Sequence, residues 1–443
     1  MKSFIQTLKN IWKIEDLKAR LLFTIGIILI YRICSFVTLP GIDPTALTQL
    51  KSQAAGGILG ILDMFSGGAF SNASIVALGI MPYISASIVV QLLAIAIPYF
   101  QKLQREGESG RRKINQITRY LTVLILIPQG FAYLTNLEYQ IPGLAEFYTF
   151  GNKIMHVIIM LSGTMFIMWL GERITEKGIG NGISMIIMIG IIARLPESLL
   201  QEFAVRLEAQ GGGLVAFLVE ILIWLVVIGL SILLVQGVRK IPVQYAKRIV
   251  GNKQYGGVRQ YIPLKVNSAG VMPIIFAQAL MMVPVTIAGF ATSDASSGFV
   301  IAFSNITGFW YNFVNAILII LFTYFYTAVT INPTQMADDM KRNGGFIPGV
   351  KPGKKTVEYL DNIMSRIILP GSLFLAFVAI MPALAKIAFP KMGMQFAQFF
   401  GGTSLLIMVG VVLDTLQQIE SHLLMRKYDG LMKSGRIKGR SGT

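Results

Sequence analysis

Long apolar stretches alternate with short polar ones over almost the whole chain. Ten of these stretches approach the length of about 20 residues that a helix needs to cross a hydrocarbon core of about 30 Å. They cover residues 21–39, 73–98, 117–136, 154–170, 182–200, 213–236, 268–290, 308–331, 363–389 and 402–417. Because a helix satisfies its own backbone hydrogen bonds in lipid, the pattern predicts an all-α polytopic membrane protein with ten transmembrane helices.

The ten predicted spans divide into two five-helix halves, residues 21–200 and 201–425. An odd number of spans in each half gives the two halves opposite orientations in the membrane. Two similar hexapeptides support this symmetry. GIMPYI at 79–84 and GVMPII at 270–275 each lie early in the second span of their half. Chance similarity in an apolar chain is the alternative. We favour an inverted repeat around a central pore, with Pro82 and Pro273 interrupting both spans.

The segment 57–70, just before the second span, differs from the other apolar stretches. It is too short to cross the membrane, and it contains several glycines and Asp63. Irregular backbone at membrane depth is tolerated only where protein or a water-filled cavity surrounds it. We therefore expect a short re-entrant helix that lies in a pore. Its glycines predict loose packing and movement at low energetic cost.

Charge is sparse and unevenly distributed. Charged residues make up 14% of the chain, against about 25% in soluble domains, and the formal net charge is +17. Most of the 39 Lys and Arg residues lie in the N-terminus, in the loops after even-numbered spans and in the basic tail 426–443. The positive-inside rule therefore places both termini in the cytoplasm. Residues 1–20 are expected to form an amphipathic cytoplasmic segment, for which a solvent-exposed helix is the alternative.

Two loops on the predicted cytoplasmic side are longer than simple connectors. Residues 239–265 are basic and alternate around a Gly-Gly turn, which predicts a β-hairpin. Residues 332–366 are rich in glycine and proline. Alternatively, the basic residues of these loops only set the membrane topology and attract anionic lipids. That alternative does not account for the length of the loops. We interpret both loops as a docking surface for a partner.

The chain contains little that could carry out chemistry. A single cysteine, Cys34, excludes an internal disulfide, and two histidines are too few for a Cys/His metal site. Residues 349–356 resemble a phosphate loop only faintly, because the spacing is wrong and no strand precedes them. The glycines of 178–182 are expected to form a tight turn. We therefore expect no enzyme activity and no cofactor, so that energy must come from a partner.

The charged residues inside predicted spans include Arg32, Glu220 and Asp414. Intramembrane acids are candidates for ion coupling. However, both acids lie towards the ends of their spans, where an interface or an ion-pair partner can satisfy them. Arg32 is expected to extend towards the outer membrane surface.

Several motifs resemble the SecY family of protein-conducting channels, in the same order along the chain. They are residues 62–93, EGESGRRK at 106–113, GIGNGIS at 178–184, YAKR at 245–248, PLKVN at 263–267, Asn332-Pro333 with Ala337-Asp338, and GGTSLLI at 401–407. The resemblance covers essentially the whole chain. One departure is Lys351 in GVKPG, where the family usually has arginine. Lysine lacks the bidentate fork, which puts the detailed contact of this loop with a partner in doubt.

The resemblance implies an hourglass channel between the two halves. Such a channel conducts unfolded secretory polypeptides across the bacterial plasma membrane and releases membrane segments sideways into lipid. It implies a plug that includes Leu59, Leu62, Phe65, Gly67, Gly68 and Phe70. It also implies a constriction formed by Ile80, Ile84, Ile183, Ile187, Ile275 and Ile407. A ring of branched alkyl groups suits a substrate of arbitrary sequence, and it dewets when closed.

The same resemblance implies partners and a docking surface. The partners are the small membrane subunits SecE and SecG, the motor SecA or the ribosome, signal sequences and unfolded chains, without nucleic-acid specificity. The docking residues are Arg239, Lys240, Lys247, Arg248, Lys341, Arg342 and Lys351. Two alternatives are a secondary transporter for a small solute and a membrane-insertion scaffold without an open pore. The absence of acids from 79–93 and 270–284 favours the channel over the transporter.

Overall fold

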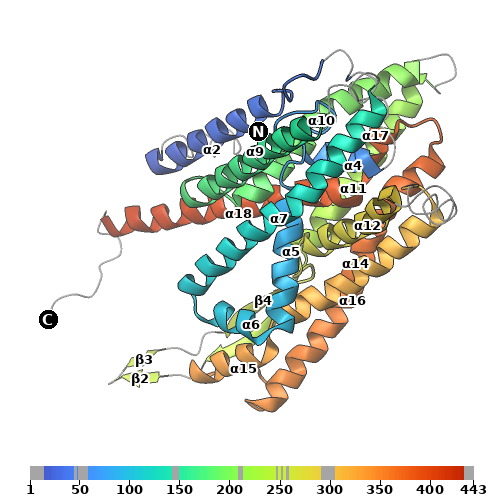
Figure 1. The fold of residues 1–443 in the computed structure, drawn as a ribbon. Coiled ribbons are helices and arrows are strands. Elements are labelled where there is room, and N and C mark those ends of the chain that lie inside the picture. Colours follow the sequence, from blue (N-terminus) through green and yellow to red (C-terminus); the bar gives the residue numbers. More distant parts are fainter. Residues whose placement is uncertain are drawn as a thin grey trace. The chain divides into compact units, whose positions relative to one another are not determined.

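The computed structural model describes residues 14–43, 47, 58–141, 149–207, 213–245, 248–250, 253–255, 259–290 and 305–433. Helices dominate this part of the chain (Figure 1). The helices that overlap the predicted spans are α2 (Glu15–Cys34), α5 (Met81–Ala96), α7 (Glu108–Gln140), α9 (Phe150–Lys177), α10 (Gly182–Leu207), α11 (Gly213–Gln236), α12 (Met272–Phe290), α14 (Phe309–Thr330), α16 (Lys354–Ala388) and α18 (Gly402–Lys433). The shorter helices are α4 (Ile58–Phe65), α6 (Pro98–Arg105), α15 (Pro333–Arg342), α17 (Met394–Ala397) and the 3-10 helix η1 (Gln398–Phe400).

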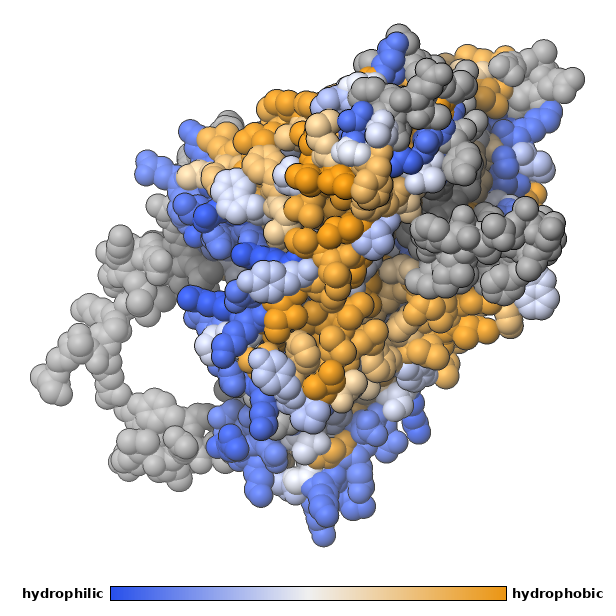
Figure 2. All heavy atoms as spheres, viewed as in Figure 1, coloured by the Kyte–Doolittle hydropathy of each residue, from blue (hydrophilic) through white to orange (hydrophobic). Residues whose placement is uncertain are grey.

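Most of the long helices have the length and apolar composition of membrane spans. Seven of the described helices are long and apolar enough to cross a membrane, and eight are if α5 and α6, which meet at a bend of 103°, count as one span. Figure 2 shows hydrophobic residues over the sides of the helices and hydrophilic residues gathered near α15. The protein is therefore an all-helical, multi-pass membrane protein, as predicted.

The chain divides into two compact units, residues 1–200 with 410–443 and residues 201–409. In the first unit, α5, α6 and α7 pack against one another, and α9 packs against α2 and α7. Its core gathers side chains such as Phe70, Tyr133, Leu134 and Met160. In the second unit, α14 packs against α12 and α16, and α15 packs against α16.

The two similar hexapeptides, residues 79–84 and 270–275, have the same local structure. Gly79 and Gly270 adopt φ values of +54° and +64°, which L-residues with a side chain rarely adopt. Each is followed two residues later by the start of a helix, α5 or α12. Pro82 and Pro273 are the second residues of these helices, where the missing N–H costs no hydrogen bond. The prediction of a proline inside each helix is therefore corrected: each proline lies in the first turn, and a non-helical part of the predicted spans 73–98 and 268–290 comes before it.

A small antiparallel sheet follows α11. Its central strand β1 (Val238–Tyr245) pairs with β4 (Arg259–Lys265) on one edge and with β5 (Gly345–Phe346) on the other. A second pair joins β2 (Arg248–Val250) to β3 (Lys253–Tyr255). The predicted hairpin is confirmed, whereas its proposed Gly256-Gly257 turn lies outside the described residues. Ile241 and Leu264 of this sheet pack against Met340 of α15 and Leu360 of α16.

Asn332 caps α15 and offers a test of this packing. Its Oδ1 accepts hydrogen bonds from the backbone N–H groups of Thr334 at 3.0 Å and Gln335 at 3.3 Å. Asn332→Ala is expected to destabilise α15 by about 1 kcal/mol, because two helix-end donors lose their acceptor. Amide hydrogen exchange over Pro333–Arg342 should become faster. Asn332→Asp keeps the acceptor and should exchange at the native rate, so equal rates in the two variants would contradict the cap.

Candidate functional site

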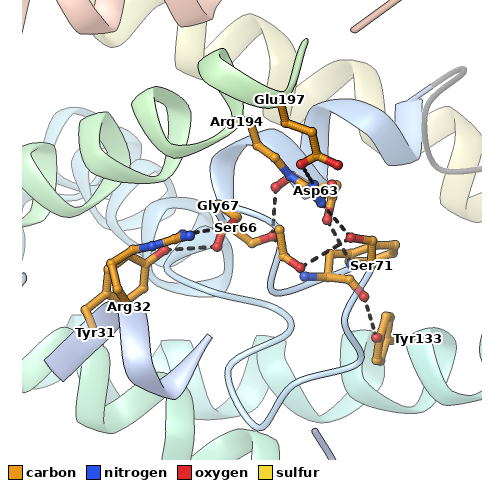
Figure 3. Close-up of polar contacts among 11 residues, drawn as sticks. Tyr31, Arg32, Asp63, Ser66, Gly67, Ser71, Tyr133, Arg194 and Glu197 are labelled. Atoms are coloured by element: carbon orange, nitrogen blue, oxygen red, sulfur yellow. Dashed lines mark hydrogen bonds and ion pairs between the residues drawn. The ribbon is translucent and has the colours of Figure 1, made fainter. Parts of the chain in front are cut away.

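Residues 58–71, which include the predicted plug 57–70 apart from residue 57, form the short helix α4 followed by a series of turns. Most of this segment is buried, including Phe65, Ser66, Ala69 and Phe70. Leu62 is half-buried, and the side chain of Leu59 lies outside the described part of the structure. Side chains from three helices of the first unit, α2, α7 and α10, reach this segment (Figure 3).

Helix α2 contacts the middle of the segment. The Tyr31 hydroxyl donates to the backbone oxygen of Ser66 at 3.0 Å, and Arg32 Nη1 donates to the backbone oxygen of Gly67 at 2.8 Å. The Arg32 guanidinium also lies 5.2 Å from the centre of the Phe36 ring. The prediction that Arg32 extends towards the membrane surface was therefore wrong, since a buried carbonyl inside the protein satisfies it.

Helix α10 contacts the segment through Arg194. Its Nη2 pairs with Asp63 Oδ2 and donates to Ser71 Oγ at 2.6 Å. The other oxygen of Asp63 accepts the Ser71 backbone N–H at 2.8 Å. Arg194 Nη1 also pairs with Glu197, one turn further along α10, at 2.7 Å. The Asp63 carboxylate therefore joins α4 and the end of the turns, at Ser71, to one guanidinium (Figure 3).

Helix α7 and the chain after α2 hold the end of the segment. The Tyr133 hydroxyl donates to the Phe70 backbone oxygen at 2.8 Å, and the two rings meet edge to face with centres 4.8 Å apart. Just beyond, the Leu39 N–H donates to the Ala73 backbone oxygen at 2.8 Å. The Ile75 N–H donates to the backbone oxygen of Val37 at 2.9 Å.

The glycines of the segment allow close packing. Gly67 and Gly68 have φ values of +66° and +90°. A Cβ at Gly67 would lie 2.8 Å from Gly190 Cα of α10, and a Cβ at Gly68 would lie 2.9 Å from the Arg194 guanidinium carbon. The prediction of loose packing was therefore wrong, because glycine here brings two backbones together.

Four of the predicted ring isoleucines lie in the first unit. Ile80 immediately precedes α5, and the Ile84 N–H donates to its backbone oxygen at 3.0 Å, which places the pair one turn apart. Ile183 and Ile187 are also one turn apart, on α10. Ile80, Ile84 and Ile187 are buried, and Ile183 is half-buried. Both pairs therefore form the two-residue apolar ridges expected from their spacing.

The remaining two isoleucines lie in the second unit. Ile275 is half-buried on α12, and Ile407 is buried on α18. The structure therefore describes four of these isoleucines within the first unit and two within the second. A closed ring of all six remains a prediction.

The predicted tight turn at 178–182 is confirmed, and it fixes the start of α10. Asn181 Oδ1 accepts the N–H groups of Ile183 and Ser184 at 3.2 and 3.4 Å. The Gly182 N–H donates to Thr175 Oγ1 of α9 at 2.9 Å. A side chain at Gly182 has no room, because a Cβ there would lie 1.8 Å from the Gly171 backbone oxygen. This contact positions Ile183 at the first turn of α10.

Comparison with known proteins identifies the family of this chain. A model of the SecY family matches residues 74–416. The chain belongs to the SecY family. The protein translocase subunit SecY of Streptomyces coelicolor is 42% identical over 439 residues, which cover 95% of this chain and 98% of that protein. The SecY subunit of Haemophilus influenzae is 42% identical over 427 residues, which cover 96% of each chain.

Solved structures share the SecY fold. One, a protein-conducting channel, covers 91% of this chain and 92% of its own with a TM-score of 0.61 and 18% identity. Another, a SecY protein whose plug domain is described as stabilising the closed state, has a TM-score of 0.61 and 19% identity. The prediction of a protein-conducting channel that is not an enzyme is confirmed by the family. The small-solute transporter is thereby set aside.

The intramembrane acids of this SecY chain have different surroundings. In the second unit, Arg206 Nε donates to Glu202 Oε1 at 3.0 Å, and its Nη2 pairs with Glu220. Glu202 Oε2 also accepts the Gly393 N–H at 2.6 Å. Asp414 is exposed on α18. Glu220 is therefore the buried partner of Arg206 in an ion pair. An ion pair was the alternative to an ion-coupling role for this residue.

Most of the predicted docking residues are exposed. Arg239 and Lys240 lie on β1, Lys341 and Arg342 end α15, and Lys351 lies just before α16. Lys247 and the side chain of Arg248 lie outside the described part of the structure. Sequence reasoning did not find Tyr31, Tyr133, Arg194 or Arg206, because each acts through a partner distant in sequence and carries no motif.

Proposed function

We propose that residues 58–71 form the plug of this channel and that Ile80, Ile84, Ile183, Ile187, Ile275 and Ile407 form its constriction. The main supporting observation is that a segment too short to span a membrane is hydrogen-bonded to three helices. The turns of residues 72–79 connect it to Ile80 and Ile84. Alkyl side chains make non-directional contacts, so a ring of isoleucines accepts a polypeptide of any sequence. The same ring excludes water and ions when no chain fills it.

In the same proposal, the channel opens across the membrane for unfolded secretory chains and sideways for signal sequences and membrane segments. It works in a bacterial plasma membrane with both termini in the cytoplasm, as the distribution of basic residues predicts. The small subunits SecE and SecG accompany it, and anionic lipids contact its basic loops.

The sheet β4–β1–β5 and α15 are the proposed docking surface for SecA or the ribosome. The exposed cations Arg239 and Lys240 lie near the start of β1, and Ile241 and Val243 of the same strand pack into the core of this unit. A packed core beneath exposed charge keeps the surface in one shape, which a specific partner requires. A similarly folded relative has been solved as Sec61 in a canine ribosome–channel complex, with a TM-score of 0.56 and 18% identity.

A disulfide test addresses the constriction. Cys34, the single native cysteine, is replaced by serine, and one cysteine is placed at Ile84. A secretory chain with its own cysteine is then stalled halfway across the membrane. Ile84→Cys is expected to crosslink to the stalled chain, because Ile84 would line the path. Val89→Cys on the same helix is the matched control, since Val89 is 38% exposed against 8% for Ile84.

The two cysteine positions separate the outcomes. A crosslink at Ile84 that requires the stalled chain, with little at Val89, supports the constriction. Equal crosslinking at both positions, or crosslinking at Val89 alone, would show that the polypeptide does not pass Ile84.

A further inference from the structure

We propose that Arg194 and Asp63 form a latch that holds the plug shut and that plug release requires this ion pair to break. The proposal rests on the proposed role of residues 58–71 as the plug. Arg194 is a positioning residue in this scheme, because it acts on the plug and not on the polypeptide that passes through the channel.

The latch fastens α4 and the end of the following turns at once. One guanidinium nitrogen of Arg194, Nη2, contacts Asp63 in α4 and Ser71 at the end of the turns. Asp63 in turn accepts the Ser71 N–H through its second oxygen. Residues 63–71 therefore form a loop that is closed at its base by a single cation. It cannot leave α10 without losing the ion pair and the hydrogen bond to Ser71 together.

The pair differs in kind from the other anchors of the segment. Tyr31, Arg32 and Tyr133 all donate to backbone oxygens, which are neutral acceptors. Asp63 and Arg194 are opposite charges, with side chains only 8% and 16% exposed. Removing one partner of a buried ion pair costs more than removing a hydrogen bond to a neutral carbonyl, because the other charge stays behind without compensation. The latch therefore dominates the barrier to release.

Glu197 makes the latch reversible. Its side chain is 61% exposed and pairs with Arg194 from the next turn of the same helix. When the plug moves away, Glu197 moves with α10 and keeps the guanidinium paired and close to its position. Arg194 is then ready to receive Asp63 again, without a search through side-chain rotamers.

The latch lies on the face of α10 that carries two constriction residues. Ile183, Ile187, Gly190 and Arg194 are spaced by four, three and four residues within α10, so they form one stripe along the helix. Gly190 faces Gly67, as the 2.8 Å approach of a Gly67 Cβ shows. A translocating polypeptide that displaces Ile187 therefore also displaces the surface of α10 against which the plug is latched.

The accessibility of a buried plug residue tests the latch. Ala69 is fully buried, and Ala69→Cys in a Cys34→Ser background adds a single sulfur atom. The complete translocase is placed in proteoliposomes and treated with a water-soluble maleimide. Asp63→Asn and Arg194→Gln are each expected to raise the labelling rate at least tenfold. The matched control, Glu176→Gln, removes a similarly exposed carboxylate from an i,i+3 pair with Arg173 on α9, outside the latch, and should stay within twofold of the parent.

The double variant Asp63→Asn/Arg194→Gln makes the test specific to the pair. Because neither charge remains, its labelling should not exceed that of the faster single variant. Rates that multiply would mean that the two residues act independently, which overturns the latch. Unchanged labelling in both single variants also overturns it, whatever else those variants do.

Ion conductance of the same variants in planar bilayers separates the latch from the plug itself. Faster labelling together with higher conductance supports both proposals. Faster labelling at native conductance supports the latch and contradicts the sealing role of residues 58–71. Higher conductance at native labelling contradicts the latch and leaves the sealing role to the constriction. Translocation of a secretory chain shows that each variant is folded.

Discussion

Arg206→Gln is expected to destabilise the protein by about 3–5 kcal/mol, the usual cost of breaking a buried ion pair by removing one partner. The side chains of Glu202 and Glu220 are 0% exposed, and that of Arg206 is 6% exposed. The variant leaves two buried carboxylates without the guanidinium that neutralises them. Thermal unfolding of the purified translocase measures the effect.

Two comparisons isolate the buried charge. Arg239→Gln removes an exposed arginine of the same unit and should change the free energy of unfolding by about 0.5 kcal/mol or less. Combining Arg206→Gln with Glu202→Gln and Glu220→Gln removes all three charges and should recover most of the lost stability. Native stability in Arg206→Gln alone would show that Arg206 does not compensate the two carboxylates.

Gly182→Ala is expected to destabilise the first unit by about 3 kcal/mol, the upper end of the usual cost of overpacking. A Cβ at this position would lie 1.8 Å from the Gly171 backbone oxygen and 2.8 Å from Ile174 Cβ. Neither group can rotate away, so α9 and α10 must separate at the turn that positions Ile183. The yield of folded protein and its unfolding temperature report the change.

Gly229→Ala is the matched control for Gly182→Ala. Gly229 also lies in a helix, α11, but nothing lies within 4 Å of a Cβ built there. Alanine favours a helix by about 1 kcal/mol over glycine, so this variant should be as stable as the parent or slightly more so. Equal destabilisation by the two substitutions would refute the close contact at Gly182.

The predictions about proline and about the plug glycines needed correction for the same reason. Pro82 and Pro273 were expected to interrupt spans, yet each occupies the first turn of a helix, where proline is favourable. The glycines of the plug were expected to loosen it, yet Gly67 brings it against Gly190. In both cases the residue type sets which conformations are allowed, and the neighbouring chain decides which of them stabilises the fold.

The sequence by itself determined the class of this protein, its family, the approximate span positions and the hairpin after α11. These features follow from local rules, because a bilayer sets the length of apolar helices and strand alternation has a period of two residues. Only the tertiary structure decided which polar groups satisfy one another. Arg194 and Asp63 lie 131 residues apart, and Tyr31 and Ser66 lie 35 apart. No periodicity links residues at such separations, since packing of helices brings them together only after each helix has formed.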